Sequence, residues 1–194
     1  MSRRSIRRFR HDPIPRELIE KILEAGIRAP TAGGGEQWFF IAITDEAKRR
    51  EIHKLLVEAH KKYAAEVLRS PMPKEKIEKW FKRMEEEGMY YAPLYVAAYL
   101  DLRRRLYRDE YSELERLWAV HSVSAAIENM LLAAHALGLG AVWLGVPLLM
   151  KEEFDRVLQP PAGCELQGII AIGYPAEEPR PRPRKNLSEV VQIM

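Results

Sequence analysis

The sequence predicts a single α+β domain, a sandwich of helices and strands that forms a dimer. Helical and strand-like segments mix along the chain without the strict βαβ rhythm of a parallel sheet, and no linker or repeat divides its 194 residues. The helix expected over residues 109–138 is apolar on nearly every side in its later half, as in a central core helix or a subunit interface. With 47% apolar residues, the chain can bury a substantial core.

The first helix is expected to follow the prolines of "DPIP" and to end near Ala29. Its apolar residues recur at helical spacing, and Pro30 disfavours the α conformation in the residue before it. A loop with three consecutive glycines, residues 33–35, comes next. The apolar run "WFFIAIT" (38–44) is then expected as a buried strand.

Asp45 can cap a second helix over residues 46–68. The inner stripe expected for this helix is Ile52, Leu55, Leu56, Ala59 and Tyr63. The highly charged stretch 70–88 begins at prolines and stops at Gly88, which predicts a helical excursion over the surface. We therefore expect about residues 60–92 to form a lid on the surface of the domain.

Two further helices and three strands are expected in the rest of the chain. In order they are a strand over 92–101, the long helix over 109–138, a strand over 140–146, a short helix over 151–158 and a strand over 165–174. The tail from Pro175 is rich in proline and arginine and too extended to pack alone, so we expect it to lie against something.

Basic residues are concentrated at both ends of the chain, although the net charge is only +3. The two clusters are Arg3, Arg4, Arg7, Arg8 and Arg10 at the start, and Arg180, Arg182, Arg184 and Lys185 near the end. Together they suggest an anionic group held between the two termini. No zinc-finger spacing and no RNP-type aromatic motif accompanies them, so a nucleic-acid partner is not expected.

The remaining composition indicates a cytoplasmic protein. The single cysteine, Cys164, excludes an intramolecular disulfide framework and a cysteine cluster for metal. The N-terminus has no apolar segment of the secretory type. The longest apolar runs are interrupted by glycine or histidine, so no membrane span is expected.

No familiar catalytic constellation is present. The sequence contains neither "GxGxxG" after a strand nor a Walker motif, and His121 lacks the "GxSxG" context of a hydrolase. His53 and His60 lie two helical turns apart and are interpreted as exposed helical residues, while His135 is interpreted as a core or interface residue. No metal site is expected. An enzyme without its own acid, base or nucleophile can still act when a cofactor carries the chemistry.

Motifs spread over almost the whole chain resemble the nitroreductase family of FMN-dependent oxidoreductases. They are "RRSIRRF" (3–9), "ELIEKILEAGIRAP" followed by "TAGGGEQWFFIAI", "NMLLAAHALGLGAVWLGVP" (129–147) and "GIIAIGYPAEEPRPRPRKNL" (168–187). The resemblance implies a three-layer sandwich with a central, mostly antiparallel sheet, assembled as an intertwined homodimer. It also implies a single domain over residues 1–194, in which the tail 175–194 reaches the partner subunit.

The resemblance implies a phosphate grip built from both ends of the chain. Its residues are Arg3, Arg4, Ser5 and Arg7, with Arg184 and the neighbouring Arg182 from the tail. Guanidinium forks pair with a phosphate dianion, and a serine hydroxyl adds a neutral hydrogen bond.

A second set of residues is implied to lie beside the flavin ring. Thr31, between Pro30 and Ala32, matches a serine of the family loop "APSAGNxQPW". Leu144 and Gly145 match a loop whose backbone amides meet the flavin near N5, where an amide donor stabilises the reduced ring.

The chain also departs from the family loop. The family asparagine falls at Gly34, and its "QPW" becomes Glu36, Gln37 and Trp38. We interpret the glycines as letting the loop pass close to the flavin edge, or as opening space for a substrate. Glu36 is then either a substrate contact or a cap on a loop amide.

Aromatic residues of the lid are candidate substrate contacts. Trp80 and Tyr90 could stack on an aromatic substrate, and packing against the body of the protein is the alternative.

The implied activity is hydride transfer from NADH or NADPH, through FMN, to a small-molecule acceptor such as a nitroaromatic or quinone. The run "WLGVPL" lacks the hydroxyl of the related iodotyrosine deiodinases, which favours two-electron chemistry over reductive dehalogenation. Dehalogenation, flavin destruction and flavin binding without turnover remain the alternatives. The physiological acceptor and the choice between NADH and NADPH are left open.

Overall fold

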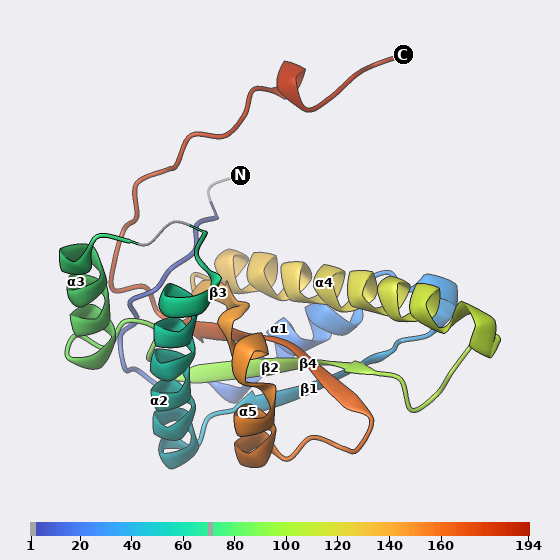
Figure 1. Cartoon of the computed structure of the whole chain (residues 1–194), viewed down its shortest axis with the longest axis horizontal. Helices are drawn as coiled ribbons and strands as arrows, with labels where there is room; N and C mark the ends of the chain where they lie inside the picture. The colour runs from blue at the N-terminus through green and yellow to red at the C-terminus, as the bar shows by residue number, and fades with distance from the viewer. Residues whose placement is uncertain (1–2, 70–71) are drawn as a thin grey trace.

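The structure is a three-layer sandwich in which helices cover both faces of a four-stranded sheet (Figure 1). This computed structural model describes residues 3–69 and 72–194. Every strand pair in the sheet is antiparallel. Across the sheet the strands are β1 (Trp38–Ile43), β2 (Leu94–Asp101), β4 (Cys164–Gly173) and β3 (Gly140–Leu144).

The helices divide between the two faces of the sheet. On one face lie α1 (Arg16–Ile27) and α4 (Ser112–Ala136), and on the other α2 (Glu46–Lys62) and α5 (Lys151–Leu158). The predicted α+β sandwich is therefore confirmed. Its predicted dimerisation remains a prediction, because one chain is described.

The core consists of two apolar clusters separated by the sheet. Along β2, Leu94, Val96, Ala98 and Leu100 face α1 and α4, whereas Tyr95, Ala97 and Tyr99 face α2 and α5. Successive side chains of a strand point to opposite faces, so a strand that is apolar throughout must be covered on both sides. β2 is the most completely buried strand because β1 and β4 also flank it.

The local signals that begin helices act as the sequence predicts. The Asp45 side chain accepts a hydrogen bond from the Lys48 amide at 2.9 Å and caps α2. α2 continues as one π-helical turn, Tyr63–Val67, and the lid helix α3 (Lys74–Glu85) follows Pro73. Short 3-10 turns occupy Ala32–Gly34, Asp109–Tyr111, Val146–Met150 and Leu187–Glu189.

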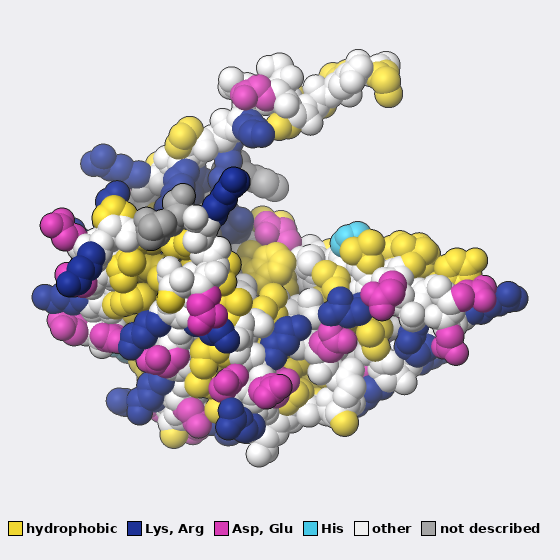
Figure 2. Space-filling model, in the orientation of Figure 1, with side chains coloured by type: hydrophobic (Ala, Val, Ile, Leu, Met, Phe, Trp, Pro, Cys, Tyr) yellow, Lys and Arg dark blue, Asp and Glu magenta, His cyan; other side chains and the backbone are white. Residues whose placement is uncertain are grey.

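α4 is the longest helix and crosses the whole sheet. Together with the preceding turn, α4 forms the segment Asp109–Ala136, which is long and apolar enough to cross a membrane. An 18-residue window within it has a mean hydropathy of 1.2. Among the described residues, 44% of this window is buried inside the fold, where α4 packs against α1 and the sheet, as in the core helix of a folded domain. Leu114 and Leu117 remain exposed on its outer face, where hydrophobic side chains form a row in Figure 2.

Four side chains differ from their expected environments. His53 is partly buried rather than exposed, and its Nε2 atom lies 3.0 Å from the Met89 carbonyl oxygen. His60 is buried, because α2 turns it toward the lid, where it stacks on Tyr90 with ring centroids 4.8 Å apart. His135 is exposed in the single chain, so the core alternative is wrong and the interface alternative remains a prediction. Arg8 belongs to the N-terminal basic cluster but not to the implied phosphate grip, which leaves a solvated face as its expected place; it is instead partly buried and pairs with Glu87 at the end of the lid.

Burial of His60 predicts a pH-dependent stability. Burial lowers the pKa of His60 below its usual 6.5, so the folded state binds fewer protons there than the unfolded state. The resulting stabilisation is complete above about pH 6.5 and is lost as the pH falls through and below that value. His60→Phe keeps a ring beside Tyr90 and should flatten the decline in the urea midpoint between about pH 8 and pH 5. An unchanged decline would contradict this assignment, and the exposed His121→Gln serves as the control.

Candidate functional site

A cavity of about 740 Å³ lies where the N-terminal segment meets the tail. Figure 2 shows basic side chains gathered at the base of the tail. The cavity is lined by Arg3, Arg4, Ser5, Arg7, Glu128, Leu132, Pro179, Arg180, Arg182 and Arg184. All six residues predicted for the phosphate grip are therefore brought together. Arg180 was missed, although it belongs to the same "PRPRPRK" run as the other two tail arginines.

Backbone hydrogen bonds hold the two ends of the chain side by side. The Ile6 amide donates to the Ala141 carbonyl on β3 at 3.1 Å. The Arg10 amide donates to the Tyr174 carbonyl at 2.9 Å, and the Ala176 amide donates to the Arg8 carbonyl at 3.0 Å. The N-terminal segment thus runs between β3 and the start of the tail, which places arginines from both ends on one cavity.

The Glu177 carboxylate stabilises this junction through a backbone amide rather than through the arginine side chains of the cavity. Glu177 accepts a hydrogen bond from the backbone amide of Arg7 at 2.6 Å, which leaves the Arg7 guanidinium to other partners. Arg7 also donates from its guanidinium to the Ser5 carbonyl at 3.0 Å. The N-terminal arginines are therefore held by the backbone around them.

The cavity carries a large excess of positive charge. Its described lining includes six guanidinium groups and one carboxylate, Glu128, which lies 3.5 Å from the Nε atom of Arg3. Like charges gathered on a concave surface repel one another and raise the local concentration of anions. The arrangement is therefore electrostatically suited to an anionic group, and guanidinium forks favour phosphate.

The loop predicted to lie beside the flavin is placed elsewhere in the single chain. The Ala32 amide donates to Ser122 Oγ on α4 at 3.2 Å, so Pro30, Thr31 and Ala32 lie near the middle of that helix. They are absent from the described lining of the arginine cavity. One chain therefore divides the predicted site residues into two groups.

Leu144 and Gly145 lie at the end of β3, the strand that also holds the N-terminal segment. Leu144 is buried, whereas Gly145 is exposed and has a φ of −92°, a conformation open to any residue. A Cβ atom on Gly145 would meet nothing within 4 Å. The fold itself does not require glycine here, and the Gly145 backbone is open to a ligand.

The glycine loop has an internal reason for its glycines. A Cβ atom on Gly33 would lie 2.3 Å from Tyr107 Oη, and one on Gly35 would lie 2.6 Å from Leu106 Cδ1. The sequence suggested that the glycines allow a flavin edge to approach the backbone. At Gly33 and Gly35, the groups that approach are instead side chains of the chain's own loop before α4. Gly34 meets nothing within 4 Å and has a φ of +68°, so it alone leaves open space.

A buried carboxylate fixes the loop that packs on the glycines. Glu115 is fully buried and accepts hydrogen bonds from the Leu106 amide at 2.7 Å, Gln37 Nε2 at 2.9 Å and Arg105 Nε at 2.5 Å. Burial acts to raise the pKa of Glu115, but these three donors together hold it below its usual value. Glu115 was not identified from the sequence. One of its hydrogen-bond donors, Gln37, is distant in the chain, and another is the backbone amide of Leu106.

Glu36 has a φ of +46° and lines a separate cavity of about 430 Å³. Arg103 and Arg104 line the same cavity, and Arg103 is held by a bidentate pair with Asp101 at 2.8 and 2.6 Å. The role of Glu36 as a substrate contact remains a prediction.

The lid aromatics pack inward. Tyr90 is 6% exposed, and Trp80 meets the His60 ring edge-on with centroids 5.2 Å apart. Trp80 and Tyr90 therefore pack against the body of the protein, which was the alternative to a role in substrate binding. Contact of these residues with substrate remains a prediction.

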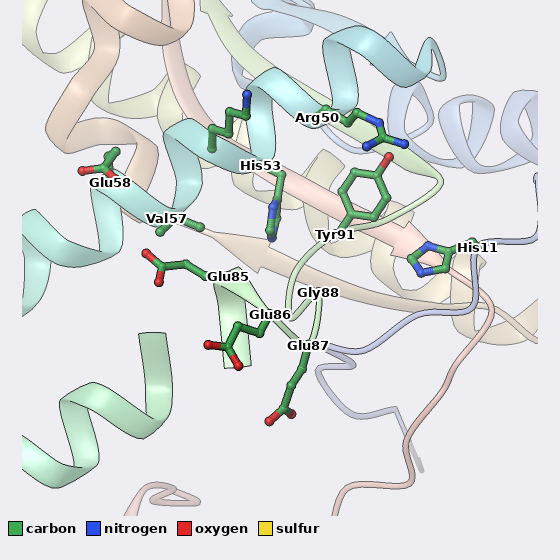
Figure 3. A pocket seen from close by; sticks show the side chains of 11 residues that line it. His11, Arg50, His53, Val57, Glu58, Glu85, Glu86, Glu87, Gly88 and Tyr91 are labelled. Carbon is green, nitrogen blue, oxygen red and sulfur yellow. The ribbon is translucent and has the colours of Figure 1, made fainter. Parts of the chain in front are cut away.

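A further cavity of about 650 Å³ lies between α2 and the end of the lid (Figure 3). Tyr91 lies at its wall between His11 and His53, with ring centroids 5.5 and 5.4 Å away. Its charges are mixed: Arg50 points toward Tyr91, while Glu85, Glu86 and Glu87 lie on the opposite side. Carboxylates outnumber the lysine and arginine side chains in this mixed lining, which distinguishes it from the arginine cavity.

Comparison with known proteins agrees with this architecture. A family model described as "Nitroreductase family" matches residues 1–174, which cover the sheet, all five α-helices and the N-terminal arginines. The chain belongs to the nitroreductase family.

Relatives of this nitroreductase family member carry several names. A protein of Methanothermobacter thermautotrophicus, provisionally named NADH dehydrogenase/NAD(P)H nitroreductase, is 34% identical over 186 residues, which span 93% of this chain and 78% of the relative. A 5,6-dimethylbenzimidazole synthase of Rhodospirillum rubrum is 31% identical over 180 residues, 91% of this chain and 80% of the relative. The crystal structure of a Bacteroides fragilis nitroreductase with bound FMN is 26% identical, with a TM-score of 0.68 and coverage of 99% and 94%.

The glycine loop generates a prediction about stability. Gly33 and Gly34 both have positive φ values, +58° and +68°, so alanine at either position should cost roughly 1 kcal/mol from backbone strain. Gly33→Ala should cost about 1–3 kcal/mol more, because its methyl group overlaps Tyr107. Urea unfolding measures both variants. Tyr107→Phe should recover part of the loss in Gly33→Ala and none in Gly34→Ala, and equal losses in the two single variants would contradict the packing described.

Proposed function

We propose that the protein is an FMN-dependent oxidoreductase that takes hydride from NADH or NADPH and passes it to an electron-poor small molecule. The acceptor class is that of nitroaromatics and quinones. The observation that carries the proposal is the cavity in which six arginines from both ends of the chain converge. Membership of the nitroreductase family and the FMN-bound Bacteroides fragilis structure support FMN as the phosphate-bearing occupant.

The residues of the cavity suit a flavin phosphate. Arg3, Arg4 and Arg7 approach from the N-terminal segment, and Arg182 and Arg184 approach from the tail. Two arms that close on one anion explain why both termini are basic, since the anion offsets the repulsion between them. Ser5, in the same lining, supplies a neutral donor.

The flavin ring is assigned to the open backbone at the end of β3. Gly145 presents exposed backbone there, on the strand whose Ala141 holds Ser5 in a bridge. The ring supplies hydride chemistry when bound, and the chain needs to orient it and exclude water. Backbone amides at this point would donate to a bound flavin and favour its reduced form without a titratable side chain.

We propose that a second copy of the chain completes the site. The loop with Pro30, Thr31 and Ala32 contacts the middle of α4 and is absent from the described lining of the arginine cavity, so the partner subunit is proposed to supply these residues. Exposed apolar side chains are available for such an interface. They are Leu114 and Leu117 on α4, and Leu187, Val190, Val191, Ile193 and Met194 on the extended tail. The tail leaves the body of the molecule in Figure 1, as expected for a segment that reaches a partner.

The activity is tested by the visible absorption spectrum of the purified protein. We expect a bound-flavin band that bleaches on anaerobic addition of NADH or NADPH and returns when a nitroaromatic or quinone is added. A band that persists with both nicotinamides would instead indicate a flavin-binding protein. A protein that shows no band after incubation with FMN would contradict the cofactor assignment.

Reversing one charge should release FMN. In Arg7→Glu, a charge-assisted pair with the phosphate becomes a repulsion, so the Kd for FMN should rise on the order of 100-fold with the fold retained by circular dichroism. Arg10→Glu changes the net charge equally but lies outside the described lining of the cavity, pairing with Asp12 at 3.4 Å. This control should keep its affinity, and tight FMN binding by Arg7→Glu would refute the role of Arg7.

A second candidate function follows from the Rhodospirillum rubrum relative, a 5,6-dimethylbenzimidazole synthase that matches 91% of this chain. A reaction of this type would consume the flavin itself. Incubation with excess reduced FMN in air separates the two functions. Irreversible loss of the flavin band would favour the synthase reaction, and quantitative recovery of oxidised FMN would favour the reductase.

A further inference from the structure

Tyr90 has a strained backbone in a buried position. Its φ is +71°, a left-handed conformation that is rare for a bulky aromatic residue, and its side chain is 6% exposed. Such strain persists only where surrounding contacts over-determine it, and it concentrates at functional sites. The neighbouring Gly88 also has a positive φ, +67°, so the chain turns sharply here at the end of the lid.

Two backbone hydrogen bonds hold Tyr90 in this conformation. Its amide donates to the carbonyl of Arg7 at 2.7 Å, and its carbonyl accepts a hydrogen bond from Tyr95 Oη at 2.7 Å. Tyr95 belongs to the fully buried strand β2. The turn is therefore fixed to the core on one side and to the N-terminal segment on the other.

The Tyr90 side chain joins the same segment to the lid. Its ring stacks on His60, with centroids 4.8 Å apart and planes 13° apart. Tyr90, His60 and Trp80 form one aromatic cluster, since the Trp80 ring also meets His60 edge-on. Burial raises the pKa of the Tyr90 hydroxyl, and the nearby side chains of Arg7 and Trp80 oppose that rise. Guanidinium and indole groups can only donate, so the Tyr90 oxygen is the acceptor available to both. Trp80 lies on α3, and Arg7 lines the phosphate cavity.

The adjacent residue faces the other way. Tyr91 lines the mixed-charge cavity of Figure 3 beside His11 and His53. A hydroxyl one residue away in the chain thus lines a cavity other than the one that contains Arg7, which makes Tyr91 a matched reference for Tyr90.

We propose that Tyr90 is a positioning residue that orients the Arg7 guanidinium toward the phosphate cavity and couples it to the lid helix α3 through Trp80. The inference rests on the proposed function, because the phosphate it concerns is that of FMN. The strained turn places one hydroxyl between a cofactor-binding arginine and the lid. Because such coupling is reciprocal, occupation of the cavity by phosphate stabilises the position of α3.

The test compares FMN with riboflavin, which lacks the phosphate, in titrations of the apoprotein followed by flavin fluorescence. Tyr90→Phe keeps the ring and removes the hydroxyl. We expect its Kd for FMN to rise roughly tenfold, as for loss of a hydrogen bond to a charged group, with the Kd for riboflavin within about twofold of wild type. Tyr91→Phe should leave both constants unchanged. A purely structural role for Tyr90 would weaken both ligands alike and would overturn the proposal.

Two further readouts test the mechanism. In a double-variant cycle, Tyr90→Phe should add little to the FMN loss of Arg7→Gln, because the hydroxyl acts through Arg7. In hydrogen exchange, FMN should protect amides of α3 more than riboflavin does in the wild type, and Tyr90→Phe should remove that difference. Additive losses, or equal protection by the two ligands, would overturn the proposal.

The titrations distinguish a failure of the positioning role of Tyr90 from a failure of the proposed flavin-dependent function. Wild-type protein that binds FMN, with Tyr90→Phe unchanged, would overturn the positioning role and leave the flavin assignment in place. Wild-type protein that binds neither FMN nor riboflavin would overturn both.

Discussion

The alignment of the N-terminal segment with the start of the tail is the constraint on which the site depends. Hydrogen bonds from Ile6, Arg10 and Ala176 join the two segments to each other and to β3. This brings like charges from opposite ends of the sequence onto one cavity, against their mutual repulsion. Under the proposed function, an anion in the cavity would turn that repulsion into attraction and so couple the fold to its ligand. Glu177 contributes by binding a backbone amide, which leaves the guanidinium groups available.

The rest of the architecture supports this junction. β2 is buried on both faces and provides the rigid centre on which β4 and β3 are ordered, and β3 in turn carries the N-terminal segment. Near the start of α4, the fully buried Glu115 joins the loop before that helix to Gln37, at the end of the glycine loop. Well-satisfied buried polar groups of this kind specify one arrangement of their neighbours. Two loops distant in sequence therefore have defined positions along α4.

Most of the fold could be predicted from local pattern, and the parts that could not depend on distant partners. Apolar runs, the Asp45 cap and proline boundaries locate the helices and strands within a few residues. The purpose of Gly33 could not be deduced, because its neighbour Tyr107 lies far along the chain and is brought close only by tertiary packing. Burial of His60 was missed for the same reason. The sequence of the charged lid does not show which of its residues will pack over His60. The arginines were predictable because clustered charge at both termini has few structural explanations, whereas the separation of Thr31 from them has no sequence signal.

The central claim is that guanidinium groups from both ends of the chain hold a phosphate dianion. It is tested most directly by phosphorus NMR of FMN bound to the protein, followed over pH. Free phosphomonoesters take up a proton with a pKa of about 6. The account predicts that the bound phosphate keeps its dianionic resonance down to about pH 5, because several arginines favour the doubly charged form. A bound phosphate that titrates like free FMN would contradict the account.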